Sequence, residues 1–176
     1  MHLPARVVLL TIIAAVAGLP DTLTTTQSLS VTIDAVAKVS VPATVTLTAS
    51  GSAFSAYTGN LTVSYKAQTT PTGGGNITMQ ISPDFSPAGG PSAASGNLTY
   101  TCSGAGLGTA CSGIVTASTT AQTAVVTLPT SGCTGGGSPC SSANPATVSV
   151  SFSLVDDPTY PTGTYSATAK FTISAT

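Results

Sequence analysis

The chain has 176 residues and carries only four Lys or Arg and five Asp, which gives a formal net charge of −1. So few positive charges cannot neutralise a phosphate backbone, and we expect no nucleic-acid partner. Thr and Val are abundant while strong helix formers are scarce, so the composition favours strands over helices.

The N-terminus has the pattern of a secretory signal peptide. His2 and Arg6 precede an apolar run from Val7 to Ala17, which closes with Ala-Val-Ala. The run is shorter than the roughly 20 residues of a membrane-spanning helix, so we expect no membrane span in the mature form. A retained hydrophobic helix is the alternative. We expect a signal peptide over 1–17, a flexible segment over 18–27 and one secreted or cell-surface domain over 28–176.

Apolar residues occupy every second position from Leu29 to Val41, which predicts a half-buried strand. Typical strands have about five or six residues, so a run of this length is unusual. Either the strand changes sheets partway, or its first half reaches beyond its own domain. After Pro42 the alternation resumes at Val45 and Leu47.

The same alternation marks further strands at regular spacing, and no segment after the signal has a helical period. Loops rich in Gly, Pro, Ser and Asp separate these strands. Eight or nine strands of this kind predict an all-β fold, an immunoglobulin-like or Greek-key β-sandwich. The further strands are expected over 61–67, 77–81, 98–100, 114–116, 124–128, 148–154 and 165–173.

Four cysteines in an exported chain predict disulfides. Proximity favours Cys102 with Cys111 and Cys133 with Cys140, among three possible connectivities. The spacings do not match a zinc site.

A G-N-apolar-T pattern occurs three times, at Asn60, Asn76 and Asn97. Gly and Asn tolerate positive φ, so each pair can end a turn and begin a strand. The alternative is N-glycosylation, because all three sites are N-x-T acceptors.

The chain lacks most of the side chains that enzymes usually use for catalysis. Beyond the expected signal the chain has no His, Glu or Arg, so no Ser-His or Cys-His nucleophile can be assembled. The one acidic pair, Asp156 and Asp157, precedes Pro158 in a turn, where Asp commonly binds backbone amides. A calcium site there is the alternative. We expect no enzyme activity, no metal and no cofactor.

The C-terminal segment enters the last expected strand as P-x-G-x-Y, with Gly163 and Tyr165 as a structural corner. The segment 163–168, followed by Phe171-Thr172-Ile173, also resembles the final strand of spore-coat-U-like and fimbrial subunits. That resemblance implies a secreted β-sandwich subunit of a bacterial surface fibre. Such subunits polymerise by donor-strand complementation, in which the extended N-terminal segment of one subunit fills a groove of the next. The N-terminal cysteine of many fimbrial subunits has no counterpart here.

Donor-strand assembly also has a physical basis in this chain, because an open sandwich edge leaves backbone groups that another strand can pair. We therefore expect the donor strand to be Leu29, Val31, Ile33 and Ala35, and the partner to be another copy or other surface proteins. The alternative is an ordinary first strand within its own sheet.

The sequence leaves two further functions as alternatives. A carbohydrate- or surface-binding adhesin module would use loop aromatics, for which Tyr57 and Tyr160 are the candidates. Ice binding through Thr44, Thr46 and Thr48 is the weakest reading, since no repeat extends that face.

Overall fold

The computed structural model describes residues 27–49, 51, 54–137, 139–142 and 144–176. The signal peptide expected over 1–17 lies outside these residues, as does the flexible segment expected over 18–27 except for Gln27. The chain divides into two units, one up to Thr32 and one from Ile33 onward. The described part of the first unit has no strand, and every strand belongs to the second. No helix occurs in the described residues, so none has the length and apolarity to cross a membrane.

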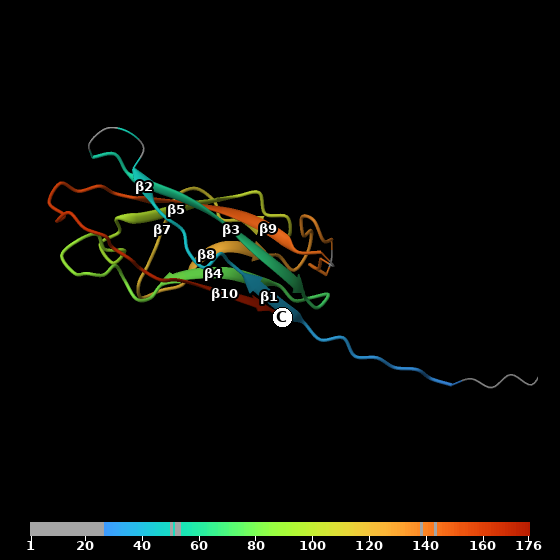
Figure 1. Ribbon diagram of the computed structural model, residues 1–176. Coiled ribbons are helices and arrows are strands. Elements are labelled where there is room, and N and C mark those ends of the chain that lie inside the picture. The colour runs from blue at the N-terminus through green and yellow to red at the C-terminus, as the bar shows by residue number, and fades with distance from the viewer. Residues whose placement is uncertain (1–26, 50, 52–53, 138, 143) are drawn as a thin grey trace, which may run out of the picture. The chain divides into compact units, whose positions relative to one another are not determined.

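Two antiparallel sheets make up the second unit (Figure 1). The six-stranded sheet has the order β1-β3-β9-β5-β7, with β2 also paired to β3, and the four-stranded sheet has the order β10-β4-β8-β6. The all-β, sandwich-like fold predicted from the alternation is confirmed. The strands are β1 (Val36–Ser40), β2 (Thr48–Ala49), β3 (Tyr57–Gln68), β4 (Gly75–Ile81), β5 (Leu98–Ser103), β6 (Thr109–Ala110), β7 (Val115–Thr116), β8 (Thr123–Leu128), β9 (Ala146–Leu154) and β10 (Ala169–Ala175).

The hydrophobic core lies between the two sheets and follows directly from the alternation. On β3 the buried residues Leu61, Val63 and Tyr65 lie at every second position, while Thr62 between them is exposed. Val63 is paired with Val148 of β9, which is also fully buried. The core therefore receives side chains from both sheets. The buried residues that the four-stranded sheet contributes are Ile77, Met79, Ile81, Val125, Val126 and Leu128.

The first expected strand is much shorter than the alternation predicts. Only Val36–Ser40 forms β1, which pairs with β3, and residues 28–35 form no strand. The last strand likewise begins at Ala169 rather than at Tyr165. Before it, the backbone bonds to the loop that follows β4: Thr168 N–H donates to Pro83 O at 3.1 Å, and Ser82 N–H donates to Thr168 O at 2.8 Å. These two hydrogen bonds to a loop replace the regular hydrogen-bond ladder of a strand.

The strand count also differs from the eight or nine expected. Ten strands occur in the described residues, and β2, β6 and β7 have two residues each. The strand β6 was not predicted, because two residues cannot show an alternation. The expected continuation at Val45 and Leu47 is replaced by β2, which begins at Thr48.

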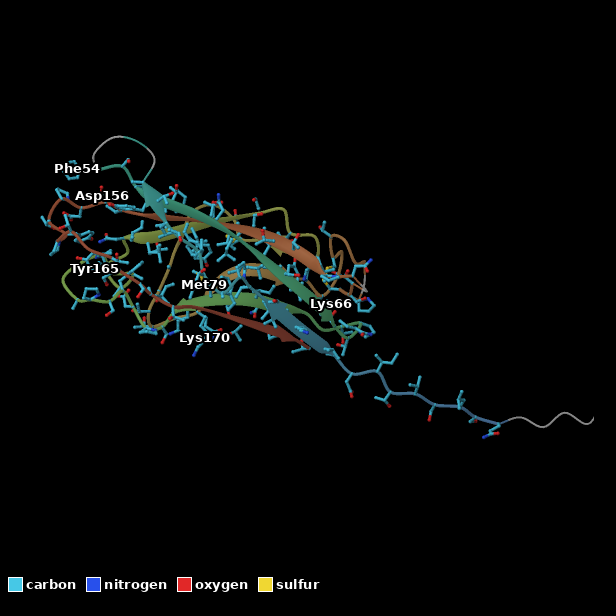
Figure 2. All side chains as sticks on the ribbon, viewed as in Figure 1. Phe54, Lys66, Met79, Asp156, Tyr165 and Lys170 are labelled. Carbon is cyan, nitrogen blue, oxygen red and sulfur yellow. A yellow bond between two sulfur atoms is a disulfide. The ribbon has the colours of Figure 1, made fainter. Side chains whose placement is uncertain are left out.

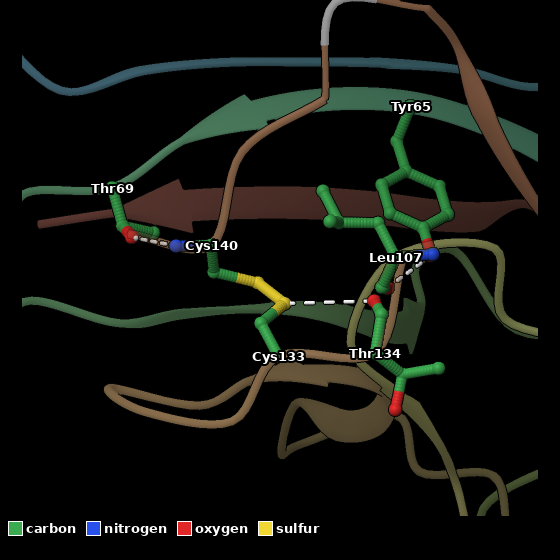
Figure 3. Close-up of a disulfide and its surroundings, with 6 residues drawn as sticks. All are labelled: Tyr65, Thr69, Leu107, Cys133, Thr134 and Cys140. Carbon is green, nitrogen blue, oxygen red and sulfur yellow. Dashed lines mark hydrogen bonds between the residues drawn. A yellow bond between two sulfur atoms is a disulfide. The ribbon is translucent and has the colours of Figure 1, made fainter. Parts of the chain in front are cut away.

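Both disulfides pair neighbouring cysteines, as their spacing favoured. Cys102 in β5 is bonded to Cys111, which directly follows β6, so this disulfide joins the two sheets. Cys133 and Cys140 close the loop between β8 and β9 (Figure 3). The backbone N–H of Cys140 donates to Thr69 Oγ1 at 2.9 Å, which attaches this loop to the end of β3.

Candidate assembly groove

A groove of about 900 Å³ opens at the end of the sandwich where β3 begins and where β4 and β9 end. The strands β1 and β10 are edge strands of their sheets and contact each other. Along this side β1 ends at Ser40 and β10 begins only at Ala169. The segments 41–47 and 155–168 continue from these strand ends and form no regular ladder. The groove lies between these two segments, and we call it the assembly groove.

The floor of the assembly groove is the end of the hydrophobic core. Leu61, Leu98, Phe152 and Leu154 line it from the six-stranded sheet, and Ile81 lines it from the four-stranded sheet. All five are buried within the chain, yet they border the open space. A side chain that enters the groove therefore meets an apolar surface.

A gap in strand pairing lies beside this floor. β1 pairs with β3 from Ser64 to Gln68, and β2 pairs with β3 at Tyr57 and Thr58. No strand among the described residues therefore pairs with residues 59–63 of β3 on that side. Gly59 lies close to the 41–47 segment, which forms one wall of the groove. A Cβ at this position would lie 2.7 Å from both Leu47 Cδ2 and Thr46 O. Only glycine lets the wall approach β3 so closely.

Most aromatic residues of the chain gather at the assembly groove. The chain has four Phe and five Tyr, and seven of these nine line the groove. The two exceptions, Tyr65 and Tyr100, are buried in the core. The seven are Phe54, Tyr57, Phe85, Phe152, Tyr160, Tyr165 and Phe171.

The two sequence-predicted ligand tyrosines, Tyr57 and Tyr160, both line the assembly groove. Tyr57 begins β3 and is 37% exposed. Tyr160 is half-buried, and its phenol oxygen accepts a hydrogen bond from Asn97 Nδ2 at 2.6 Å. The structure therefore brings together two residues that are 103 positions apart in the sequence.

The predicted structural corner lies at the rim of the groove. Tyr165 Oη donates to Pro161 O at 2.7 Å, four residues upstream. The ring is half-buried and packs on Gly90, where any Cβ would overlap ring atoms. Gly163 is exposed beside the same ring. The corner thus joins the 155–168 segment to the loop that follows β4, outside the buried core.

Asp84 organises that loop through four hydrogen bonds. Its carboxylate accepts from Phe85 N at 2.8 Å, Ser92 Oγ at 2.6 Å, Ala93 N at 2.9 Å and Ala94 N at 3.4 Å. Partial burial opposes ionisation, but these hydrogen bonds outweigh it and lower the pKa of Asp84. Phe85 of this loop lines the groove, so Asp84 fixes part of its wall.

The acidic pair Asp156 and Asp157 forms part of a turn at the groove. Asp157 Oδ1 accepts from Thr159 N at 2.8 Å and from Thr159 Oγ1 at 2.7 Å. The backbone and side-chain hydrogen bonds from Thr159 lower the pKa of Asp157. Within the described residues no group of three His, Cys, Asp or Glu lies close enough to hold a metal ion.

The three G-N-x-T sites have different surroundings. Asn76 is the second residue of β4, and Asn97 directly precedes β5, where Gly96 adopts a φ of 77°. Those two fit a turn that begins a strand. Asn60, in contrast, lies inside β3 and is exposed.

The expected donor residues lie outside the sheets. Leu29 is 96% exposed, Val31 is 84% exposed and Ile33 is 68% exposed, whereas Ala35 is half-buried. None of the four belongs to a strand. Within the described part of the chain, Leu29, Val31 and Ile33 are therefore largely uncovered.

Exposed apolar side chains are confined almost entirely to two places. Among the described residues, ten large apolar side chains are exposed. Five of them line the assembly groove, four lie between Leu29 and Val36, and Ile114 is the exception. Alternation in the sequence indicated the second group. The first group was not predicted to share one groove, because its members come from separate parts of the chain: Val41, Val45, Phe54, Tyr57 and Val155.

No family model, curated protein or solved structure matches the chain.

Proposed function

We propose that this protein is a secreted, non-enzymatic structural subunit of an extracellular fibre, pilus or coat. In this proposal, residues 29–35 of one copy fill the assembly groove of the next. The two disulfides support the secreted part, because such bonds persist in oxidising compartments.

The observation that carries the proposal is the distribution of exposed apolar surface. Among the described residues, one part of this surface lines the assembly groove, and the other part lies on the alternating segment between Leu29 and Val36. Monomeric proteins rarely leave contiguous apolar surface uncovered, and large patches of this kind mark interaction sites. Insertion of one part into the other would cover both.

The pairing of β1 with β3 favours insertion between copies. β1 begins at Val36 opposite Gln68, whereas the groove lies at the Tyr57 end of β3. These ends are eleven residues apart, which is roughly 36 Å along a strand. To reach its own groove the chain would have to reverse at Ala35 and run back beside β1. Insertion into another copy needs no reversal, and the resulting head-to-tail contact produces an open filament when its rotation does not close a ring.

The alternation also fits the shape of the site. In an extended segment Leu29, Val31 and Ile33 point to one side, while Ser30, Thr32 and Asp34 point to the other. Burial of three such side chains contributes on the order of 6 kcal/mol before the cost of association.

Deletion of residues 18–35 tests the proposal. We expect the truncated protein to stay folded, because none of the described residues that it removes belongs to a strand, and to remain monomeric in sedimentation and electron microscopy. We expect the mature protein to form filaments. A synthetic peptide of residues 27–37 should bind the truncated protein, and a peptide with Val31→Asp and Ile33→Asp should not. Filaments formed equally well after the deletion would refute the proposal.

A carbohydrate-binding adhesin is the second candidate, and one observation favours it. Tyr57 and Tyr160 lie in the same groove, together with the carboxylates of Asp156 and Asp157. Aromatic faces beside polar groups are typical of sugar sites. A glycan array with the truncated protein and its Tyr57→Ala variant separates the functions: sugar binding lost on substitution supports the adhesin, and peptide binding without sugar binding supports the fibre subunit.

A further inference from the structure

We propose that Lys38 and Lys66 form a binding site for an acidic polysaccharide on the outer face of the six-stranded sheet. This site is separate from the assembly groove and does not depend on the function proposed for that groove. The anionic group that it would take is a carboxylate or a sulfate.

Strand register places the polar ends of four residues together. β1 and β3 pair so that Lys38 lies directly opposite Lys66, and Ser40 lies directly opposite Ser64. Opposite residues of an antiparallel pair project from the same face with Cβ atoms about 5 Å apart. The neighbouring Tyr65 is buried in the core, so the four residues project from the outer face.

The two lysines have no acidic partner in the part of the chain that the structure describes. Like charges directly opposite each other destabilise an antiparallel pair. Neither ammonium group takes part in an ion pair among the described residues, and both lysines are exposed. The chain has only three lysines, so two thirds of them occupy this one unfavourable pairing.

Protection of a sheet edge accounts for only one of them. Lysine on an edge strand discourages pairing with other chains, and β1 is an edge strand. Lys66, however, lies on β3 where β3 is already paired with β1. Lys66 therefore does not protect a sheet edge, but together with Lys38 it completes a site with two cations.

A hollow is present at the same place. A depression of about 220 Å³ is lined by the two lysines, both serines, Tyr65 and Pro145. Two ammonium groups and two hydroxyl groups can donate hydrogen bonds to the oxygens of one anionic group. Pro145 directly precedes β9 and adds an apolar side to the hollow.

The surrounding face indicates a sparsely charged, hydroxyl-rich ligand. Along β3 and β9, Ser64 is opposite Thr147, Thr62 is opposite Ser149, and Asn60 is opposite Ser151. These side chains can bind sugar hydroxyls, and none of them carries a charge. Nucleic acid would need several more cations along its path. A polysaccharide with isolated carboxylates or sulfates matches one two-lysine site among neutral donors.

Affinity electrophoresis of the mature protein tests the proposal at low ionic strength. Gels contain polygalacturonate, dextran sulfate or neutral dextran. We expect retardation by one or both polyanions: polygalacturonate assigns the group to a carboxylate, and dextran sulfate assigns it to a sulfate. Retardation should weaken with added salt, as expected for exposed charges. Migration unaffected by either polyanion would overturn the proposal.

Lysine substitutions locate the site. Lys38→Gln and Lys66→Gln should each weaken binding roughly threefold, and the double variant about tenfold. Lys170→Gln is the matched control, because it removes the same charge from β10 on the other sheet (Figure 2). Binding should survive in Lys170→Gln. An equal loss in that variant would show a response to net charge alone and overturn the site.

A stability measurement gives a second readout. Bound polysaccharide should raise the unfolding temperature of the mature protein and not that of the double variant. Relief of repulsion should leave each single variant at least as stable as the parent protein. A large loss of stability in both single variants would instead mean that the lysines serve the fold, and would contradict the proposal.

Discussion

The phenol of Tyr65 holds both backbone groups of Leu107. Its hydroxyl donates to Leu107 O at 2.5 Å and accepts from Leu107 N–H at 3.2 Å (Figure 3). Both residues are buried, and they lie 42 positions apart. The Tyr65 side chain thereby ties the loop between β5 and β6 to the six-stranded sheet, beside a backbone hydrogen bond from Gly106 N–H to Thr147 O of β9 at 2.9 Å.

Tyr65→Phe should therefore destabilise the protein by about 1–3 kcal/mol, because two buried backbone groups lose their partner. Urea unfolding monitored by circular dichroism measures the change. Tyr57→Phe is the control, since Tyr57 is more exposed, and it should change stability by less than about 0.5 kcal/mol. Equal effects of the two substitutions would contradict the role assigned to Tyr65.

Alkaline pH should destabilise the fold through two tyrosines. Burial raises the pKa of Tyr65 and of Tyr100 above 10.0, against smaller lowering effects from Leu107 and Thr123. In the unfolded chain these phenols ionise near pH 10.0, whereas the folded protein retains their protons. Their contribution to stability is therefore complete below pH 10 and falls as the pH rises toward the raised values.

Urea unfolding between pH 8 and pH 11.5 checks this dependence. The double variant Tyr65→Phe, Tyr100→Phe should be less stable at pH 8 but should lose less stability above pH 10. A decline that is equally steep in both proteins would assign the alkaline effect to other groups.

Removal of the disulfide between the sheets should destabilise the protein. Cys102 and Cys111 join β5 to the residue after β6, and the bond closes a loop of nine positions. Substitution of both by Ser should lower the free energy of unfolding by roughly 2.5 kcal/mol. Denaturant unfolding under oxidising conditions measures the loss against the parent protein, which keeps both disulfides. An unchanged unfolding midpoint would show that the sheets need no covalent link.

Alternation alone was sufficient to predict the long strands and much of the core. Residues such as Val63 and Val150 are buried because their positions repeat every two residues on a strand with one solvent face. The same rule overextended the first strand. Leu29 to Val41 keeps its alternation throughout, yet only Val36–Ser40 has a partner strand in β3. A local pattern cannot report whether another strand is available.

The candidate site could be predicted only in part. Leu29, Val31 and Ile33 were identified because they form a regular series. The assembly groove was not, since its walls come from loops such as 41–47 and 155–168 that meet only after folding. Tyr57 and Tyr160 were singled out one by one as loop aromatics, and nothing in their spacing placed them in one groove. The lysine pair depends on strand register, which also follows from the fold.

Asp84 should be needed for the wall of the assembly groove. Asp84→Ala removes a carboxylate that accepts four hydrogen bonds, and should lower stability by about 1–2 kcal/mol. Asp34→Ala, which removes the same charge from an exposed position, should have little effect. Because the pKa of Asp84 is lowered, its contribution is present above pH 3.8 and is lost as the pH falls through the folded value.

Urea unfolding at pH 7 and at a series of lower pH values measures both effects. The difference between Asp84→Ala and the parent protein should shrink as the pH falls through the lowered pKa of Asp84, because the parent carboxylate becomes protonated there. A difference that stays constant would mean that the substitution acts through packing alone.

Filament assembly should depend on which side of the donor segment is changed. Val31→Asp places a charge among the side chains that would enter the apolar groove, where burial of an unpaired charge is strongly unfavourable. Thr32→Asp adds the same charge one residue later, on the side that would face solvent. Neither residue belongs to a strand, so both variants should unfold like the parent protein. Sedimentation should find Val31→Asp monomeric and Thr32→Asp assembled. If the two variants assemble to the same extent, the segment does not enter the groove as an alternating strand.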